Sequence, residues 1–156
     1  MYMRMIETEQ ELPRIVCLCG STRFANEFMQ ASFDETLAGR IILSVGCFPR
    51  NPDGSWNPAM VSDAQKVQLD ELHKRKIDLA DEILVLNVNG YIGDSTRSEI
   101  AYCRAAGKPV RYRDISTDGG QTWTVTPGIE VWVNKDSSLV RCTYGEVMVE
   151  PATVAQ

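Results

Sequence analysis

Short apolar runs alternate along this chain with longer stretches of helical pattern. The runs cover residues 14–19, 40–45, 82–88 and 110–113. Uninterrupted apolar runs are typical of strands buried on both faces, and strands that alternate with helices favour a mostly parallel sheet with helices on both faces. We therefore predict the α/β class: a doubly wound, mostly parallel five-stranded sheet, Rossmann-like (flavodoxin-like), with a C-terminal antiparallel β extension.

Three helices are predicted between these runs. The apolar positions of the first helix are Phe24, Phe28, Met29 and Leu37. Gly39 ends this helix. The apolar stripe of the second helix consists of Val61, Leu69, Leu72 and Ile77. His73, the only histidine, lies among the charged residues of that helix, so we expect it to be exposed to solvent. The third helix is predicted over residues 96–106.

The length of 156 residues fits a single domain, 1–156. We assign residues 14–113 to the α/β core, residues 114–150 to a β-hairpin extension, and residues 1–13 and 151–156 to loose termini. Within the extension, turn residues at 116–123 precede short strands predicted at 130–133, 139–142 and 146–149. Prolines and glycines in the segment 46–57 predict a long irregular segment, which is often functional in a compact domain.

The net charge and the composition limit the classes of partner that the protein can bind. A net charge of −5 argues against a non-specific nucleic-acid binder, which needs a basic surface. No apolar run approaches the length of a membrane span, and the first residues lack the pattern of a signal peptide. The five cysteines show no zinc-type spacing, and Cys17 and Cys19 are predicted to be small buried hydrophobic residues on one side of a strand. We expect a cytoplasmic protein with no metal, no other cofactor, and no nucleic-acid or membrane partner.

A turn with phosphate-binding character follows the first strand. Gly20 allows a ligand close to the backbone, Ser21 and Thr22 offer hydroxyl groups, and Arg23 can hold a phosphate through two hydrogen bonds. The helix after the turn adds free N–H groups. The turn is neither a Walker A loop nor a dinucleotide fingerprint, because it lacks the further glycines of both. An ordinary helix start, with Ser21 or Thr22 as the cap, explains the same residues.

A second polar turn, within residues 90–101, follows the strand predicted at 82–88. Its hydroxyl and carboxylate side chains are Asp94, Ser95, Thr96, Ser98 and Glu99. Ligands of open α/β sheets bind at the carboxyl edge of the strands, where a carboxylate is a candidate nucleophile for a sugar carbon. Thr96 and Glu99 also have the spacing of a capping box, which would give them a structural role only. Both turns are predicted at the same sheet edge, so a phosphate cradle and a carboxylate can face one crevice.

Together the two turns resemble a known family. Cys-Gly-Ser-x-Arg after the first strand, with Asp-Ser-x-x-x-Glu-Ile and Gly-Lys-Pro-Val after a later one, is similar to motifs of the nucleoside 2-deoxyribosyltransferase superfamily. The resemblance favours its 2'-deoxynucleoside 5'-monophosphate N-glycosidase branch and covers residues 14–113. It implies that Glu99 attacks the anomeric carbon of the sugar and forms a glycosyl ester. It also implies that Gly20, Ser21 and Arg23 hold a 5'-phosphate.

Other site residues follow from the same resemblance. Asp94 resembles an aspartate that assists at the base or the sugar, but it stands five residues before Glu99 where the family usually has six, and Gly93 occupies that place. Ser95 or Ser98 replaces a loop serine that contacts phosphate. Family members assemble across subunits, so the resemblance implies a homodimer or a higher homo-oligomer.

Three aromatic residues are candidates for contact with the base or the sugar: Tyr91, Phe48 and Trp56. Phe48 and Trp56 belong to the segment 46–57, which can close over a base, and Trp56 can equally pack against the helix that follows. Asp78 and Asp81 are expected to end a helix or to be solvated, with contact to the sugar as the alternative.

The predicted function is hydrolysis of the N-glycosidic bond of a (2'-deoxy)nucleoside 5'-monophosphate through a covalent intermediate on Glu99. One alternative is transfer of deoxyribose between bases. Another is a sensor that binds nucleotide without catalysis, and a third is an interaction module whose turns are only helix caps. In the first three cases the partner is a small-molecule nucleotide or nucleoside.

Overall fold

One parallel sheet organises the fold. The computed structural model describes residues 11–116, 130–135 and 138–143. The main sheet has the order β2-β1-β3-β4, and all neighbouring strands run parallel. Its strands are β1 (Ile15–Cys19), β2 (Ile41–Leu43), β3 (Glu82–Val88) and β4 (Val110–Ile115). The predicted parallel sheet is confirmed. The predicted number of five strands is wrong for the described residues. The strands described after β4 pair with each other and do not extend this sheet.

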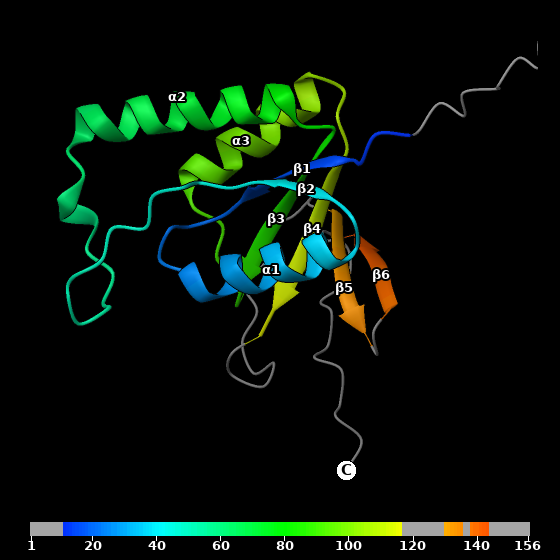
Figure 1. The fold of residues 1–156 in the computed structure, drawn as a ribbon, viewed down its shortest axis with the longest axis horizontal. Coiled ribbons are helices and arrows are strands. Elements are labelled where there is room, and N and C mark those ends of the chain that lie inside the picture. Colours follow the sequence, from blue (N-terminus) through cyan, green and yellow to red (C-terminus); the bar gives the residue numbers. More distant parts are fainter. Residues whose placement is uncertain (1–10, 117–129, 136–137, 144–156) are drawn as a thin grey trace, which may run out of the picture.

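Helices cover both faces of the sheet. They are α1 (Ala25–Leu37), a short 3₁₀ helix (Pro58–Met60), α2 (Asp63–Leu79) and α3 (Asp94–Ala105). Helices α2 and α3 lie side by side on one face, and α1 lies on the other (Figure 1). Because successive strand residues point to opposite faces, β1 gives Val16 and Leu18 to the α1 side and Cys17 and Cys19 to the α2–α3 side. None of the helices described here is long and apolar enough to span a membrane.

The buried face of α2 differs from the predicted stripe. Leu69 and Leu72 are exposed, whereas His73 and Ile77 are buried. His73 is only 5% exposed, so the prediction that it faces solvent is wrong. The reason is helical geometry: His73 stands four residues before Ile77, and residues four apart share one face. That face packs on the sheet.

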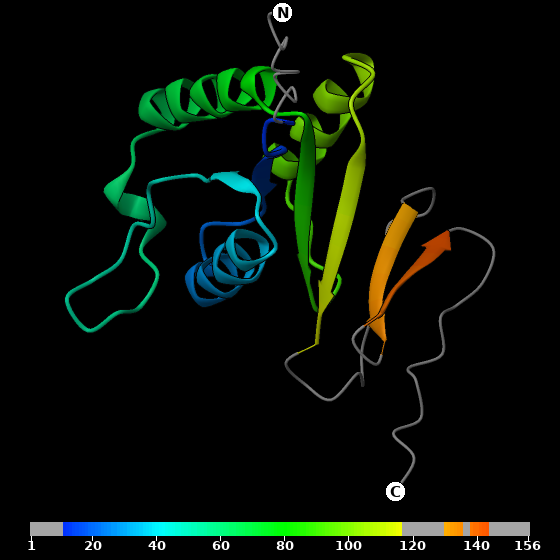
Figure 2. The same cartoon turned by 45° about the vertical axis from the view of Figure 1, so that its right-hand side comes forward.

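The C-terminal part contributes a strand pair. β5 (Glu130–Lys135) and β6 (Ser138–Thr143) are antiparallel and form a sheet separate from the parallel one. Strand β5 lies beside β4 (Figure 2). The strands predicted at 130–133 and 139–142 are confirmed. The turn predicted at 116–123, apart from its first residue, and the strand predicted at 146–149 lie outside the described residues.

Helix α1 buries a carboxylate against the sheet. Met29 and Leu37, which were predicted to be core positions, are mostly exposed, and the buried residues are Phe28, Ala31 and Glu35. Arg111 of β4 and Arg40 donate to Glu35, with nitrogen–oxygen distances of 2.7 Å and 3.0 Å. Arg111 also pairs with the buried Glu82 of β3 at 2.9 Å. Against the effect of burial, the two carboxylates raise the pKa of Arg111.

Removing the Glu35 carboxylate should destabilise the fold. Glu35→Ala leaves Arg111 with one partner fewer in a largely buried position, and we expect the free energy of unfolding to fall by about 3 kcal/mol. Asp34→Ala is the matched control, because Asp34 directly precedes Glu35 in α1 and forms a more exposed pair with Arg113; its loss should cost less than about 1 kcal/mol. Urea unfolding followed by circular dichroism measures both losses. Equal losses would contradict a stabilising role for the buried pair.

Candidate active site

The two candidate turns meet at the carboxyl edge of the sheet. Strands β1 and β3 are neighbours, and each is followed by one of the turns. Arg23 donates from Nη2 to the Tyr91 hydroxyl at 3.1 Å, and its guanidinium carbon lies 4.1 Å from the centroid of the Tyr91 ring. The predicted location of both turns at one sheet edge is therefore confirmed. In a sheet of this order, the crevice between β1 and β3 is where ligands bind.

Arg23 is exposed but held on several sides. Its Nε donates to Ser21 Oγ at 3.2 Å, and its guanidinium carbon lies 4.7 Å from the centroid of the Trp56 ring. Trp56 donates from Nε1 to Thr22 Oγ1 at 3.1 Å, and Arg50 donates to the Arg23 carbonyl at 3.1 Å. The segment 46–57 thus lies against the Gly20–Arg23 turn. Trp56 therefore contacts this turn and helps to hold the Arg23 guanidinium in place.

The first turn is not a side-chain cap. Helix α1 begins at Ala25 with Phe24 as its N-cap residue and no capping side chain, so the alternative of Ser21 or Thr22 as the cap is wrong. At Gly20, a Cβ would lie 3.3 Å from Leu86 Cβ and 3.3 Å from the Phe28 ring, so a side chain there would have to displace these neighbours slightly. Phe48 packs edge-on against Phe28, with ring centroids 5.2 Å apart, on the α1 side of the sheet.

The start of α3 rules out the capping box. The helix begins at Asp94 with Gly93 as N-cap and no capping side chain. Because the helix starts two residues earlier than predicted, Thr96 and Glu99 fall inside it, and both are buried. Asp94 points the other way: its side chain is fully exposed and lies 3.6 Å from Arg97. The structure therefore does not bring Asp94 together with Glu99.

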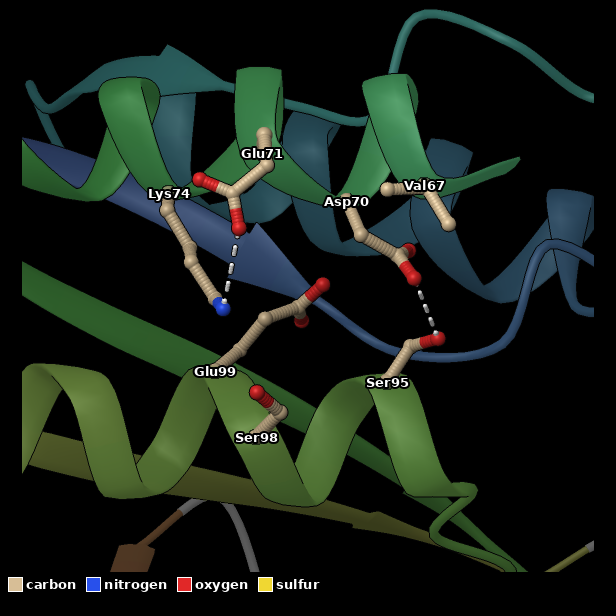
Figure 3. A pocket seen from close by; sticks show the side chains of 7 residues that line it. All are labelled: Val67, Asp70, Glu71, Lys74, Ser95, Ser98 and Glu99. Carbon is tan, nitrogen blue, oxygen red and sulfur yellow. Dashed lines mark hydrogen bonds and ion pairs between the residues drawn. The ribbon is translucent and has the colours of Figure 1, made fainter. Parts of the chain in front are cut away.

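A pocket of about 160 Å³ opens between α2 and α3 (Figure 3). Its polar lining comprises Asp70, Glu71 and Lys74 of α2 and Ser95, Ser98 and Glu99 of α3. Ser95 donates to Asp70 at 3.2 Å and accepts from Lys66 at 2.6 Å. Glu99, Ser95 and Ser98 are thus brought together, while the Gly20–Arg23 turn is not part of this lining. The turn and the pocket are linked by Cys19, which precedes Gly20 and whose thiol acts to lower the pKa of the Glu99 carboxylate.

The Glu99 carboxylate lies in a buried environment. Its Oε2 is 3.9 Å from His73 Nε2 and has no hydrogen-bond partner among the described residues. Burial raises the pKa of Glu99 from its ordinary 4.5 to about 7, although His73 opposes the rise. Burial by itself lowers the pKa of an imidazole, but the hydrogen bond with Cys17 and the charge of Glu99 outweigh it, so the pKa of His73 lies above its usual value. Glu99 is therefore able to gain or lose a proton near neutral pH.

Sequence reasoning missed the residues that surround Glu99. Asp70 and His73 come from α2, and Cys17 and Cys19 come from β1. One ligating atom each of Cys17, Cys19 and His73 also lie within 4.8 Å of one another, a grouping that the spacing of the cysteines in the sequence did not reveal. The available signal was the four-residue spacing of His73 and Ile77, which places His73 on the buried face of α2.

Asp78 and Asp81 lie away from the site. Asp81 accepts from the backbone N–H of Ile15 at 2.7 Å, at the amino end of β1. Asp78 accepts from the Tyr102 hydroxyl at 2.6 Å and pairs with Arg75 at 2.9 Å. These contacts give both carboxylates structural roles, and the alternative that one of them reaches the sugar is not supported.

Comparisons with known proteins yield distant likenesses only. No family model and no curated protein matches the chain. A 2-deoxyribosyltransferase from Bacillus psychrosaccharolyticus is 16% identical, with 67% of this chain and 74% of that chain covered and a TM-score of 0.47. A 2-desoxiribosyltransferase from Leishmania mexicana is 17% identical, with 69% and 67% covered and a TM-score of 0.44. A conserved protein from Enterococcus faecalis V583 is 14% identical, with 70% and 68% covered and a TM-score of 0.45. These likenesses are too distant to assign a function.

Proposed function

We propose that this chain hydrolyses the N-glycosidic bond of (2'-deoxy)nucleoside 5'-monophosphates, with Glu99 as the nucleophile, in a homodimer or larger homo-oligomer. One observation carries the proposal. Glu99 is a buried carboxylate that lines a pocket, and one of its oxygens has no hydrogen-bond partner among the described residues. Leaving such an oxygen unpartnered costs stability, and a cost of this kind is typical of a group that is kept for function.

The reaction has two steps. A Glu99 oxygen attacks C1' of the sugar as the bond between C1' and the base nitrogen breaks, and the base leaves with the bonding electron pair and takes up a proton. Water then attacks C1' of the glycosyl ester and passes its proton to the group that protonated the base, which releases the sugar 5-phosphate and restores the carboxylate. Both transition states have oxocarbenium character, which nearby negative charge stabilises.

Asp70 is better placed than Asp94 to supply the proton to the leaving base. A general acid must lie within hydrogen-bond reach of the group that it protonates. Asp70 lines the same pocket as Glu99, whereas the Asp94 side chain is fully exposed and beside Arg97. We therefore assign proton transfer to Asp70.

The charges of the site favour separate places for sugar and phosphate. Three carboxylates, those of Asp70, Glu71 and Glu99, line the pocket together with one amine, that of Lys74. This lining suits a hydroxyl-bearing sugar and repels a phosphate. Arg23 is the exposed cation at the neighbouring turn, and a guanidinium can hold a phosphate through two hydrogen bonds. We assign the phosphate to this turn.

Chromatography of released base tests the proposal. Purine and pyrimidine nucleoside 5'-monophosphates, in ribo and deoxyribo forms, are incubated with the protein, with and without a second free base. Hydrolysis predicts free base without any acceptor. If base is released only when a second free base is present to accept the sugar, the activity is transfer and not hydrolysis. Nucleotide binding without release of base over hours would overturn catalysis and leave the sensor.

The rate of base release should rise through neutral pH. The nucleophile is the carboxylate form of Glu99, and burial raises its pKa to about 7. The fraction of enzyme in which the nucleophile is ionised therefore increases as pH passes upward through about 7, whereas an ordinary glutamate is already ionised near neutral pH. Initial rates at subsaturating substrate between about pH 5 and 9, with a chelator in the buffer, give the profile. A rate that falls steadily over this range would contradict the assignment.

A further inference from the structure

Three ligating atoms converge beneath α2. His73 Nε2 lies 3.6 Å from Cys17 Sγ and 3.4 Å from Cys19 Sγ, and the three atoms are all within 4.8 Å of one another. All three residues are buried, with the cysteines wholly inaccessible to solvent. The role proposed for Glu99 does not require two thiols at this place.

The fold explains the convergence. Cys17 and Cys19 are two residues apart on β1, so both side chains point to the face covered by α2 and α3. Helix α2 packs on that face through His73 and Ile77, which places the imidazole over the two thiols. The ligands therefore come from the sheet and from a helix that packs on it, both of which are rigid elements.

The distances match those of a metal site. In a tetrahedral zinc site with Zn–S bonds of about 2.3 Å and Zn–N bonds of about 2.0–2.1 Å, a sulfur and a nitrogen ligand lie about 3.6 Å apart. The two sulfur–nitrogen distances here, 3.6 Å and 3.4 Å, agree with that separation. Binding of an ion therefore requires little movement of the imidazole relative to either thiol. Two thiolates and an imidazole are also the ligand types that select Zn²⁺ among the common divalent ions.

Glu99 supplies a further oxygen beside the cluster. Its Oε2 is buried, has no hydrogen-bond partner in the described part of the chain, and lies 3.9 Å from His73 Nε2. Glu99 also lines the pocket between α2 and α3. A carboxylate oxygen completes a four-ligand set of accepted zinc donors.

We propose that Cys17, Cys19 and His73 bind a single Zn²⁺ ion, with Glu99 as the fourth ligand. Each thiol releases its proton as it binds, the imidazole binds through Nε2, and no electron is transferred. Because Glu99 serves both the ion and the sugar, the two compete. This competition rests on the proposed function: the zinc-loaded protein should not release base, and removal of zinc should restore release.

Cobalt binding tests the site without reference to activity. Reduced, chelator-treated protein is titrated with Co²⁺, and we expect thiolate-to-cobalt charge transfer in the near ultraviolet and tetrahedral visible bands, which saturate at one ion per chain and disappear when Zn²⁺ is added. Cys17→Ser, Cys19→Ser and His73→Asn should each weaken binding by at least about tenfold to a hundredfold, the size of effect seen even for loss of an outer-shell partner.

Cys103→Ser and Cys47→Ser are the matched controls, because Cys103 is a buried free thiol and Cys47 a partly buried one, and neither belongs to the cluster. Both should bind Co²⁺ as the unchanged protein does. Absent thiolate bands, or equal loss in the controls, would overturn the site, and circular dichroism confirms that each variant is folded. Base release that persists in the zinc-loaded protein would overturn the competition at Glu99. Failure of the proposed function is a separate result: no base release from metal-free protein, whatever the cobalt spectrum shows.

Discussion

Glu99→Gln should abolish base release while the protein stays folded. The amide keeps the size of the side chain but cannot form the glycosyl ester, and we expect kcat to fall by about a thousandfold or more, as when other catalytic nucleophiles are removed. Glu71→Gln is the control, because Glu71 lines the same pocket but pairs with Lys74 at the exposed side, and it should retain most of the activity. Initial rates of base release measure both variants.

Glu99→Gln should also change how the stability of the protein depends on pH. In the folded protein burial raises the pKa of Glu99 from 4.5 to about 7, so the folded state binds a proton that the unfolded state releases between these values. The contribution of Glu99 to stability is thus present below about pH 4.5 and is lost as pH rises to about 7. Relative to the unchanged protein, Glu99→Gln should become more stable over this interval, as urea unfolding at several pH values can show. Full activity of the variant would remove the covalent mechanism.

Arg23→Ala should weaken the binding of monophosphates and leave nucleosides nearly unaffected. Loss of charge-assisted hydrogen bonds to a phosphate corresponds to a rise in KM of about 10- to 100-fold, and a nucleoside has no phosphate to lose. The structural cost should be small, since Arg23 is exposed and its contacts with the Tyr91 and Trp56 rings are worth about 0.5–1 kcal/mol each at such a site.

Arg23→Lys separates charge from geometry. The lysine keeps the positive charge but lacks the planar fork, so its KM for monophosphates should lie between those of the unchanged protein and Arg23→Ala. Paired kinetics with a nucleoside and its 5'-monophosphate give the comparison. If Arg23→Ala raised KM equally for both substrates, the phosphate would have to bind elsewhere.

The sequence predicts the framework of this fold well because its strands are strongly apolar. Strand β3 was placed at its observed bounds, and the turns after β1 and β3 meet as parallel topology requires. The faces of the helices were predicted less well. Helix α2 carries charged residues on most of its surface, and its buried stripe includes a histidine in place of an aliphatic residue, so hydrophobic spacing pointed to Leu69 and Leu72.

The candidate site was predicted in part for the same reason. Glu99 and its two serines could be found because they follow a strand in one continuous segment. Asp70 and His73 lie at least 26 residues earlier in the chain than Glu99, and only the packing of α2 on α3 brings them to it. Local spacing can place His73 on the buried face of α2, but it holds no information about which residues that face contacts. The cysteine pair was seen, but its meaning depends on the imidazole placed above it.

The position of Glu99 inside α3 limits how the protein can adapt. Its backbone is fixed by a helix that packs on the sheet, so it cannot shift to suit ligands of different size. Any accommodation has to come from the opposite wall, where Val67 and Glu71 stand on the rim of α2. We therefore expect exchanges at Val67 to change which base is accepted, with the chemistry at the sugar left as it is.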